Sequence, residues 1–464
     1  MGENCNHHKL LKILKEIVVV IVLSSIILIP FLTNGIVLKY LQKLTGTSCA
    51  FLDPQLFHGD ENQWLRSAKY FKLFYIDKAI NSKEWEQYDS YDQPPVGKYI
   101  IGLALVITGQ GDKIKELQGI SKWNFDHDYN WNVAHGAVPP PQLLNFVRLT
   151  MALIGVLTCL LIYYIGRKTF SMKTGIIASL LLAYNPLMVA YSRRAMTDCP
   201  LLLFLTINVV LIMFFYQAFL RQKSFNVFVF AILIGINTAL AAGTKLNGGL
   251  TMIIFIIFCI LMVITIAIQY KISERSHADK IKMHRGIKII TSSFLLSIFI
   301  AGVVFVGMNP YLYRQPLKRT IKLIEHRMSV VHNQQKYNPK ATLTSLNEKF
   351  SSVIKRTLLP GNYVILGSIF KIPIDFGLFI LGLFILLYLE IKHYIKNCMI
   401  SSKSVVILWF IITFLGIIIW IPLDWDRYYL PIIPCIVMMV GYSIDKIIVN
   451  GWSLLTKKKI VSGY

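Results

Sequence analysis

The sequence TMIIFIIFCILMVITIAI occupies residues 251–268 and contains no charged side chain. Its length approaches the roughly 20 apolar residues that an α-helix needs to cross a bilayer. Similar apolar runs occupy residues 151–165, 201–219 and 287–306. Runs of this kind, repeated along one chain, predict an all-α polytopic membrane protein.

The overall composition agrees with this interpretation. The chain has 464 residues, of which 55% are hydrophobic and 16% are charged, whereas soluble proteins carry about a quarter charged residues. The formal net charge of +24 does not indicate nucleic-acid binding, because much of the Lys and Arg flanks apolar runs, where it sets topology. Seven scattered cysteines without CxxC spacing predict neither a disulfide framework nor a thiolate zinc site.

The apolar runs predict ten spans, or eleven if a further short run also crosses. Their approximate bounds are 16–36, 145–166, 174–191, 199–219, 225–242, 247–269, 287–307, 373–391, 404–421 and 428–448. The run at 96–106 is too short to span and is predicted to lie at the interface. The basic N-terminus and its long apolar stretch from Ile17 favour a retained first helix over a cleaved signal peptide.

The placement of basic residues predicts the orientation. With residues 1–15 in the cytoplasm, the connections at 167–173, 221–223, 271–288 and 392–403 and the tail at 449–464 all lie inside, and all are basic. This agreement is what the positive-inside rule requires. The membrane domain then covers residues 16–448. It has two large outer loops, the first long connection (37–144) and the second long connection (308–372).

Both long connections contain an amphipathic pattern. In DENQWLRSAKYF, an apolar face of Trp64, Leu65, Ala68 and Phe71 predicts a helix lying on the membrane. In PLKRTIKLIEHRM, the apolar face consists of Leu317, Ile321, Ile324 and Met328, surrounded by Lys and Arg. The second helix suits an anionic lipid headgroup, and a plain solvated charged face is the alternative.

Candidate site residues begin in the first long connection. Asp60 and Glu61, in FHGDENQW, are carboxylates of the kind that act as general bases. The structural alternative is a capping box formed by Asp60 and Gln63. Lys98, in SYDQPPVGKY, could neutralise a phosphate at headgroup depth, and a snorkelling lysine is the alternative.

Further charged residues are predicted at the outer ends of later spans. In SRRAMTD, Arg193 and Arg194 precede Asp198, which indicates either anion binding or an Arg–Asp pair. Lys245 lies in GTKLNGG. Arg427 lies beside Tyr428 in DWDRYYLPIIP, where two prolines interrupt the last span; irregular backbone at membrane depth is tolerated where it lines a cavity.

A metal site is the competing interpretation. His58, Asp60, Glu61, His127, Asp128 and His135 are all predicted to lie on the outer side. No HExxH motif or fixed helical spacing links them.

The order of these motifs resembles the GT-C superfamily of polyprenyl-phosphate-dependent glycosyltransferases. The resemblance is to the dolichyl-phosphate-mannose protein mannosyltransferases and the bacterial aminoarabinose transferases of lipid A. The segments that carry it, over roughly residues 16–435, are Asp60-Glu61, DQPPVGK, RLTMALIGVLTCLLIYYIGR, SRRAMTD, AAGTKLNG and RYYLPIIP. The chain departs from the mannosyltransferase pattern at Gln93, where histidine is common, and has no added domain in the second long connection.

The resemblance implies transfer of a sugar from a polyprenyl-phosphate donor to a hydroxyl of a protein, lipid or glycan acceptor, with inversion. It implies Asp60 as the catalytic base, and Glu61 as a residue that orients the acceptor or holds the local fold. The implied donor-binding residues are Lys98, Arg193, Asp198, Lys245, Arg427 and Tyr428. We expect no required cofactor, with a divalent metal as the alternative.

Two other functions are compatible with a polytopic chain: a lipid-linked sugar flippase or polysaccharide exporter, and a non-catalytic assembly subunit. A flippase would need polar residues deep within several spans. The expected location is the prokaryotic cell (inner) membrane, with the active site on the outer or periplasmic face.

Overall fold

The computed structural model describes residues 2–33, 40, 43, 57–272 and 277–461. Eight helices in these ranges are long and apolar enough to cross a membrane. They are α8 (Pro141–Thr169), α11 (Asp198–Leu220), α12 (Ser224–Thr244), α13 (Leu250–Ile272), α14 (His277–Gly307), α18 (Ile374–Asn397), α19 (Ser402–Trp420) and α20 (Ile433–Val461). Each overlaps a predicted span, so the prediction of an all-α multi-pass membrane protein is confirmed.

The prediction of one continuous helix at 174–191 is wrong. It is a pair of helices, α9 (Met172–Ala183) and α10 (Pro186–Ser192), bent by 63° at the break. Pro186 has no N–H for a continuing helix. Asn185 accepts hydrogen bonds from the backbone N–H groups of Leu187 and Met188 and so starts a new one. A hydropathy pattern alone does not reveal the effects of this proline and this capping asparagine.

Within the described residues, the candidate spans therefore number eight, or nine if the bent pair counts as one, against the ten to eleven predicted for the chain. The remaining predicted span falls on α1 (Gly2–Leu32), whose described apolar part, Glu16–Leu32, is shorter than the eight. Part of the predicted span at 16–36 lies outside the described residues.

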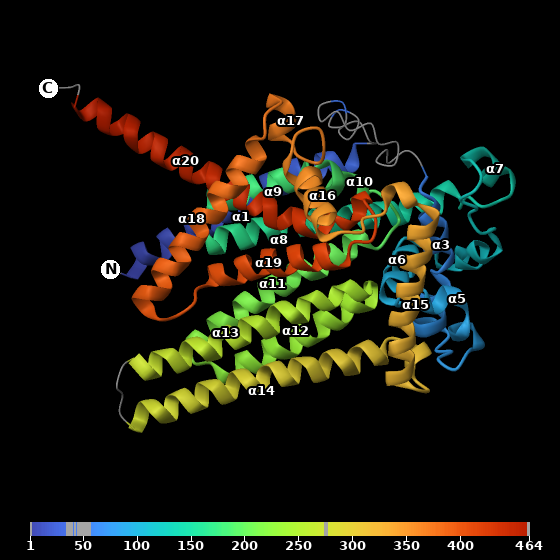
Figure 1. The fold of residues 1–464 in the computed structure, drawn as a ribbon, viewed down its shortest axis with the longest axis horizontal. Coiled ribbons are helices and arrows are strands. Elements are labelled where there is room, and N and C mark those ends of the chain that lie inside the picture. The colour runs from blue at the N-terminus through green and yellow to red at the C-terminus, as the bar shows by residue number, and fades with distance from the viewer. Residues whose placement is uncertain (1, 34–39, 41–42, 44–56, 273–276, 462–464) are drawn as a thin grey trace.

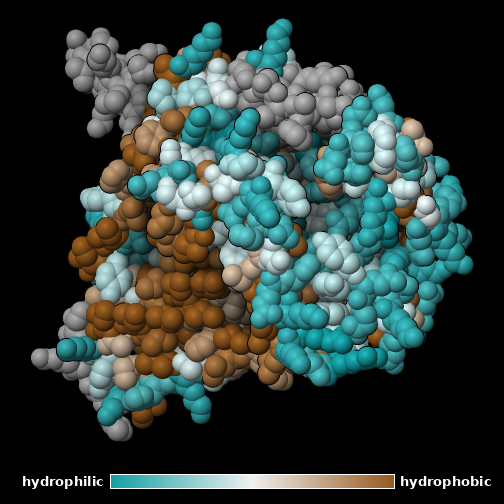
Figure 2. All heavy atoms as spheres, turned by 45° about the vertical axis from the view of Figure 1, so that its right-hand side comes forward, coloured by the Kyte–Doolittle hydropathy of each residue, from teal (hydrophilic) through white to brown (hydrophobic). Residues whose placement is uncertain are grey.

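The spans lie side by side, with residues 59–134 of the first long connection and 316–337 of the second gathered at one end, here called the loop end (Figure 1). Helices α11 and α20 are central, because 72% of the residues in the most apolar stretch of each span are buried inside the protein. The corresponding share is 17% for α14 and 22% for α18. Apolar side chains form a belt over the spans, and hydrophilic side chains cover the loop end (Figure 2). This division is expected of a protein whose solvent is lipid along its sides and water at its ends.

The first long connection folds as a series of short helices. They are α3 (Gly59–Arg66), α4 (Lys69–Phe71), η2 (Lys72–Ile76), η3 (Lys83–Glu86), α5 (Tyr88–Tyr91), α6 (Val96–Ile107), η4 (Gly111–Gly119) and α7 (Tyr129–Ala134). The predicted apolar face of residues 64–71 is helical, but it is buried in the protein core and packs against α6. The prediction that this face lies on the membrane is therefore corrected. Helix α6 is apolar, and at 12 residues it is too short to span, as predicted.

The second long connection crosses over the first. It contains η6 (Pro310–Leu312), α15 (Pro316–Tyr337), η7 (Pro339–Ala341), α16 (Leu346–Leu358) and α17 (Leu366–Phe370). The predicted apolar face of α15 is helical and remains exposed, with Leu317 84% exposed. Helix α15 is fixed to the first long connection by Arg327, which donates to Asp92 at 3.0 Å, and by Arg319, which donates to Glu86 at 2.8 Å.

Candidate active site

Helix α3 positions Asp60 at the loop end. The residue that caps this helix is His58: its ring Nδ1 accepts from Asp60 N at 3.2 Å, and His58 N donates to Glu61 at 3.0 Å. The predicted capping box of Asp60 and Gln63 is therefore wrong by two positions. Because His58 takes the capping role, the side chain of Asp60 is not used to cap its own helix.

Asp60 forms a salt bridge with Arg427, which lies on η8 (Asp426–Tyr428) near the C-terminal end of the chain. The distance from Arg427 Nη1 to Asp60 Oδ2 is 2.6 Å. Burial opposes ionisation of this carboxyl, but the charges of Arg427, His58 and Lys245 outweigh it, so the pKa of Asp60 lies below its ordinary value. Asp60 is thus a carboxylate at neutral pH and can accept a proton.

A second buried pair lies in the same cluster. Lys245 Nζ donates to Asp198 Oδ1 at 2.6 Å, joining the end of α12 to the start of α11. Burial lowers the pKa of Lys245, and the neighbouring Asp198 opposes this effect. Because Lys245 and Asp60 also influence each other electrostatically, the two ion pairs form one charged site. Four residues predicted from separate motifs are therefore brought together.

A tight turn, η5 (Leu246–Gly249), holds Lys245 in place. A Cβ atom on Gly248 would lie 2.2 Å from Ala241 C, whereas one on Gly249 would have no heavy atom within 4 Å. Backbone cannot move aside as a flexible side chain can. Gly248→Ala is therefore expected to destabilise the protein by about 1–3 kcal/mol through overpacking, and to disturb the Lys245–Asp198 pair.

Thermal unfolding of purified protein checks this expectation, with Gly249→Ala as the matched control. Equal midpoints for the two variants would show that the turn tolerates the added methyl group.

Glu61 faces away from this cluster and is fully buried. Arg148 on α8 donates to both of its carboxylate oxygens, at 2.8 and 2.6 Å, and Ala195 N donates at 2.8 Å. With the bond from His58 N, four donors occupy the carboxylate. This geometry favours the second of the two roles implied for Glu61, which is to hold the local fold.

Lys98 is also directed into the protein. Its Nζ donates to the carbonyls of Asp89, Ser90 and Gln93, each at 2.6 Å, and lies over the Tyr70 ring. Burial lowers the pKa of Lys98 to about 7, although only the ammonium form supplies three donors to these carbonyls. Lys98 therefore organises the 89–93 loop in this conformation, and is neither a snorkelling lysine nor a partner of Asp60.

Two predicted site residues, Tyr428 and Arg193, and the neighbouring Arg194 make other contacts. Tyr428 stacks on Trp425, and the Arg427 guanidinium lies over both rings. Arg193 donates to the Thr33 carbonyl at 3.4 Å. Its neighbour Arg194 is 1% exposed and lies over the Tyr191 ring.

Sequence reasoning missed two functional neighbours. Arg148 opens the RLTMALIG run, and its position gave no indication that it would pair with Glu61, 87 residues earlier. The sequence indicates His58 only as a candidate ligand of the competing metal site. Burial, together with the charges of Arg194 and Arg427, holds the pKa of His58 below its ordinary value.

The residues of the competing metal interpretation do not converge in the described ranges, where no three His, Cys, Asp or Glu side chains could hold a metal ion. The rings of His127 and His135 both stack on the Trp131 ring, with centroid distances of 4.0 and 3.7 Å. His127 precedes Trp131 by four residues and His135 follows it by four. Asp128 caps α7 by accepting from Trp131 N.

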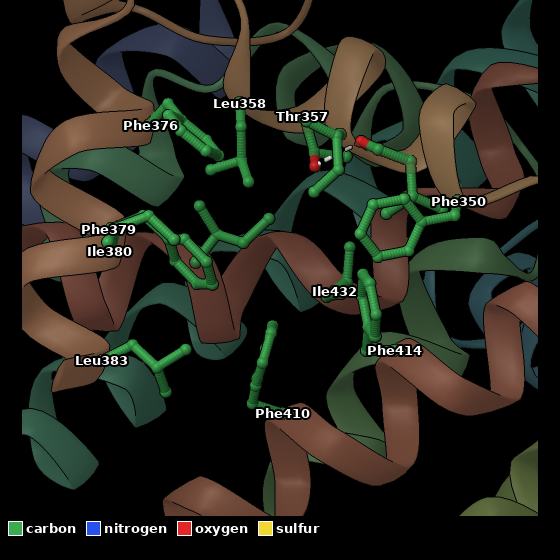
Figure 3. A pocket seen from close by; sticks show the side chains of 13 residues that line it. Phe350, Thr357, Leu358, Phe376, Phe379, Ile380, Leu383, Phe410, Phe414 and Ile432 are labelled. Atoms are coloured by element: carbon green, nitrogen blue, oxygen red, sulfur yellow. Dashed lines mark hydrogen bonds between the residues drawn. The ribbon is translucent and has the colours of Figure 1, made fainter. Parts of the chain in front are cut away.

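An apolar pocket of about 370 Å³ lies between α16, α18, α19 and α20 (Figure 3). Its wall is rich in aromatic side chains: Phe350, Phe376, Phe379, Phe410 and Phe414. The hydroxyl of Thr357, which also lines the pocket, donates to the Val353 carbonyl and is thus satisfied. The pocket also contacts Ile432 of η9 (Leu430–Ile432), which directly follows η8 and its Arg427.

Comparison with known structures identifies a related fold. ArnT from Cupriavidus metallidurans, solved bound to undecaprenyl phosphate, shares 14% identity with a TM-score of 0.50, covering 95% of this chain and 63% of that one. The apo oligosaccharyltransferase of Archaeoglobus fulgidus shares 11% identity with a TM-score of 0.49, covering 95% of this chain and 52% of that one. This chain thus spans less than two thirds of the length of either. No curated protein matches it.

A family model gives the closer assignment. Residues 69–311 match the family described as dolichyl-phosphate-mannose-protein mannosyltransferase. The matched range contains Lys98, Arg193, Asp198 and Lys245, and it lies between Asp60 and Arg427 in the sequence. The chain belongs to the dolichyl-phosphate-mannose-protein mannosyltransferase family.

Proposed function

We propose that this protein is a membrane glycosyltransferase that moves a sugar from a polyprenyl-phosphate donor to an acceptor hydroxyl on the outer face of a cell membrane. The observation that carries the proposal is the ionised Asp60 carboxylate, held 2.6 Å from Arg427 beside the Lys245–Asp198 pair. Membership of the mannosyltransferase family and the ArnT-like fold support the same reaction class.

In the proposed step, the acceptor oxygen attacks the anomeric carbon while its proton passes to Asp60. The bond from that carbon to the phosphate oxygen breaks, and its electron pair leaves with the polyprenyl phosphate. Attack opposite the leaving group inverts the sugar carbon. An alcohol is a poor nucleophile at neutral pH, so a positioned carboxylate accelerates the attack.

The leaving phosphate gains negative charge as the bond breaks. Buried cations stabilise such charge more effectively than exposed ones, because the local dielectric constant is low. Arg427 and Lys245 are near Asp60 and supply this field. When the donor phosphate draws Arg427 away from Asp60, the carboxylate loses its main stabilising charge and becomes a stronger base. We assign this neutralisation to side chains and include no required cofactor.

The apolar pocket provides a place for the polyprenyl chain. It is lined by aromatic and aliphatic side chains of α16, α18 and α19 and reaches Ile432, close to Arg427 in sequence. An isoprenoid tail is apolar along its length and gains by burial against such a wall. The undecaprenyl phosphate bound in the ArnT structure supports a lipid of this class as the donor carrier.

The flippase alternative is less well supported. A polar path through the bilayer would need polar groups available within the spans. The buried Asn208 and Asn237 instead donate to the carbonyls of Thr251 and Phe204, each at 2.9 Å. These contacts tie α11 to its neighbours.

The test uses purified protein with polyprenyl-phosphate sugars (mannose, glucose and aminoarabinose) and panels of peptide, glycan and lipid A acceptors. We expect release of polyprenyl phosphate that depends on an acceptor and product with the inverted anomeric configuration by NMR. Movement of intact donor across vesicles without cleavage would support the flippase, and inactivity with every pair would support the subunit. A divalent-ion chelator in the assay tests the assignment of no required metal.

The outer location is tested separately with a membrane-impermeant thiol reagent and a cysteine introduced at exposed Asp112, in a background where native Cys49 of the same long connection is replaced by Ser and which serves as the reference. Labelling in intact cells is expected, and labelling only after lysis would reverse the topology.

A further inference from the structure

Arg194 is a buried cation whose hydrogen-bonding capacity is not met. Its side chain is 1% exposed, and neither Nε nor Nη1 has a hydrogen-bond partner among the described residues. A guanidinium carries five N–H donors and cannot be deprotonated in a protein. A buried charge without a partner costs several kcal/mol, so a group in this position requires an anion to complete it.

The other cations of the site already have carboxylates. Arg427 is paired with Asp60 and Lys245 with Asp198, both at 2.6 Å. Within the part of the chain that the structure describes, Arg194 has no carboxylate within salt-bridge distance; its recorded contact is with the face of the Tyr191 ring, 5.2 Å from the centroid. Of the three cations, Arg194 is therefore the one left for an anion from outside the chain.

Arg194 also belongs to the same site. Its charge acts on His58, which caps the helix of Asp60, and on Asp426, which precedes Arg427. The following turn to Asp198 is fixed because Ala195 N donates to Glu61. The backbone directly after Arg194 is thus tied to α3, the helix that carries Asp60.

We propose that Arg194 is a phosphate-binding residue of this site and that the phosphate group of the polyprenyl-phosphate donor meets its unsatisfied N–H donors. The planar guanidinium suits two oxygens of one phosphate, and such charge-assisted bonds are shorter and stronger than neutral ones. The inference rests on the proposed function. It gives Arg194 a role separate from Arg427 and Lys245, whose bonds to carboxylates must open before they can contact the phosphate.

The test compares the binding of undecaprenyl phosphate, uncharged undecaprenol and inorganic phosphate to purified wild type, Arg194→Gln and Arg194→Lys. For Arg194→Gln we expect undecaprenyl phosphate to bind about 10- to 100-fold more weakly, with little change for undecaprenol. Arg194→Lys should fall between the two, because it keeps the charge and loses the two-pronged geometry. Arg314→Gln removes a charge from an exposed position at the loop end and serves as the matched control.

Unfolding without lipid separates binding from a structural role. Removing an unpaired buried charge should leave the thermal midpoint of Arg194→Met unchanged or raise it, while the added stability given by undecaprenyl phosphate should be lost. A much lower midpoint without lipid would overturn the inference in favour of a structural role.

Undiminished binding of undecaprenyl phosphate by Arg194→Gln, in a protein whose wild type is active, would overturn the inference and leave the proposed function intact. If inorganic phosphate raised the thermal midpoint of the wild type as much as undecaprenyl phosphate does at similar concentrations, the site would bind a free anion. That result would overturn the inference that the phosphate comes from a lipid. Failure of the wild type to bind undecaprenyl phosphate or turn over any donor would overturn both.

Discussion

Substitution of Asp60 by Asn is expected to lower the rate of sugar transfer by roughly 10²- to 10⁴-fold, the usual contribution of a positioned general base. The amide keeps the size of the side chain but cannot accept the acceptor proton as a carboxylate does. The measurement is release of polyprenyl phosphate under saturating donor and acceptor. Asp112→Asn, an exposed change in the same long connection, is the control and should retain full activity.

The pH profile gives a second measurement on the same residue. Because Arg427 and its neighbours hold the pKa of Asp60 below the ordinary aspartate value, the free enzyme should keep its base ionised at a pH where an unpaired aspartate is already protonated. The acid limb of kcat/KM should therefore lie lower than for an unpaired aspartate, and Arg427→Gln should move it upward. An Asp60→Asn enzyme with wild-type turnover would remove Asp60 from the mechanism.

The sequence was most informative where the signal is long and local. The apolar runs predicted the spans because length and charge depletion decide insertion into a bilayer. The bend between α9 and α10 was missed, because it depends on one proline and one capping asparagine inside an apolar run. Similarly, the apolar face at 64–71 was predicted, but no local pattern shows whether such a face meets lipid or α6.

The charged site was predictable only in part. The motif order singled out Asp60, Asp198, Lys245 and Arg427, which the fold does bring together. Sequence could not show that Lys98 turns inward to three carbonyls. The resemblance gave Asp60 and Glu61 different roles but left two roles open for Glu61, because adjacent helical residues point in different directions and only the fold shows the partners of each.

Glu61→Gln is expected to destabilise the protein by about 3–5 kcal/mol, because breaking a buried ion pair leaves Arg148 uncompensated. The carboxylate is fully buried and receives both of the Arg148 bonds as well as the Ala195 N–H. The loss should appear as a lowered thermal midpoint and a lowered denaturant midpoint. Asp60→Asn, by contrast, should change activity much more than stability.

Glu348 provides a matched control for this substitution. It also occupies the third position of a capping box, on α16, but it is exposed and its partners are Thr344 and Ser345 rather than an arginine. Glu348→Gln should therefore have a small effect on stability. Similar losses for Glu61→Gln and Glu348→Gln would show that capping, and not the pair with Arg148, is what Glu61 contributes.

A double replacement decides between a structural and a catalytic role for Glu61. Glu61→Met with Arg148→Met removes both charges together, so it should recover much of the stability lost by Glu61→Gln, since apolar residues of similar volume often replace a buried pair at little cost. If Glu61 only holds the fold, activity should return along with stability, because Asp60, Arg427 and Lys245 are untouched. A stable but inactive double variant would instead give Glu61 a direct part in transfer. The two adjacent carboxylates would then share the chemistry that we otherwise propose for Asp60 alone.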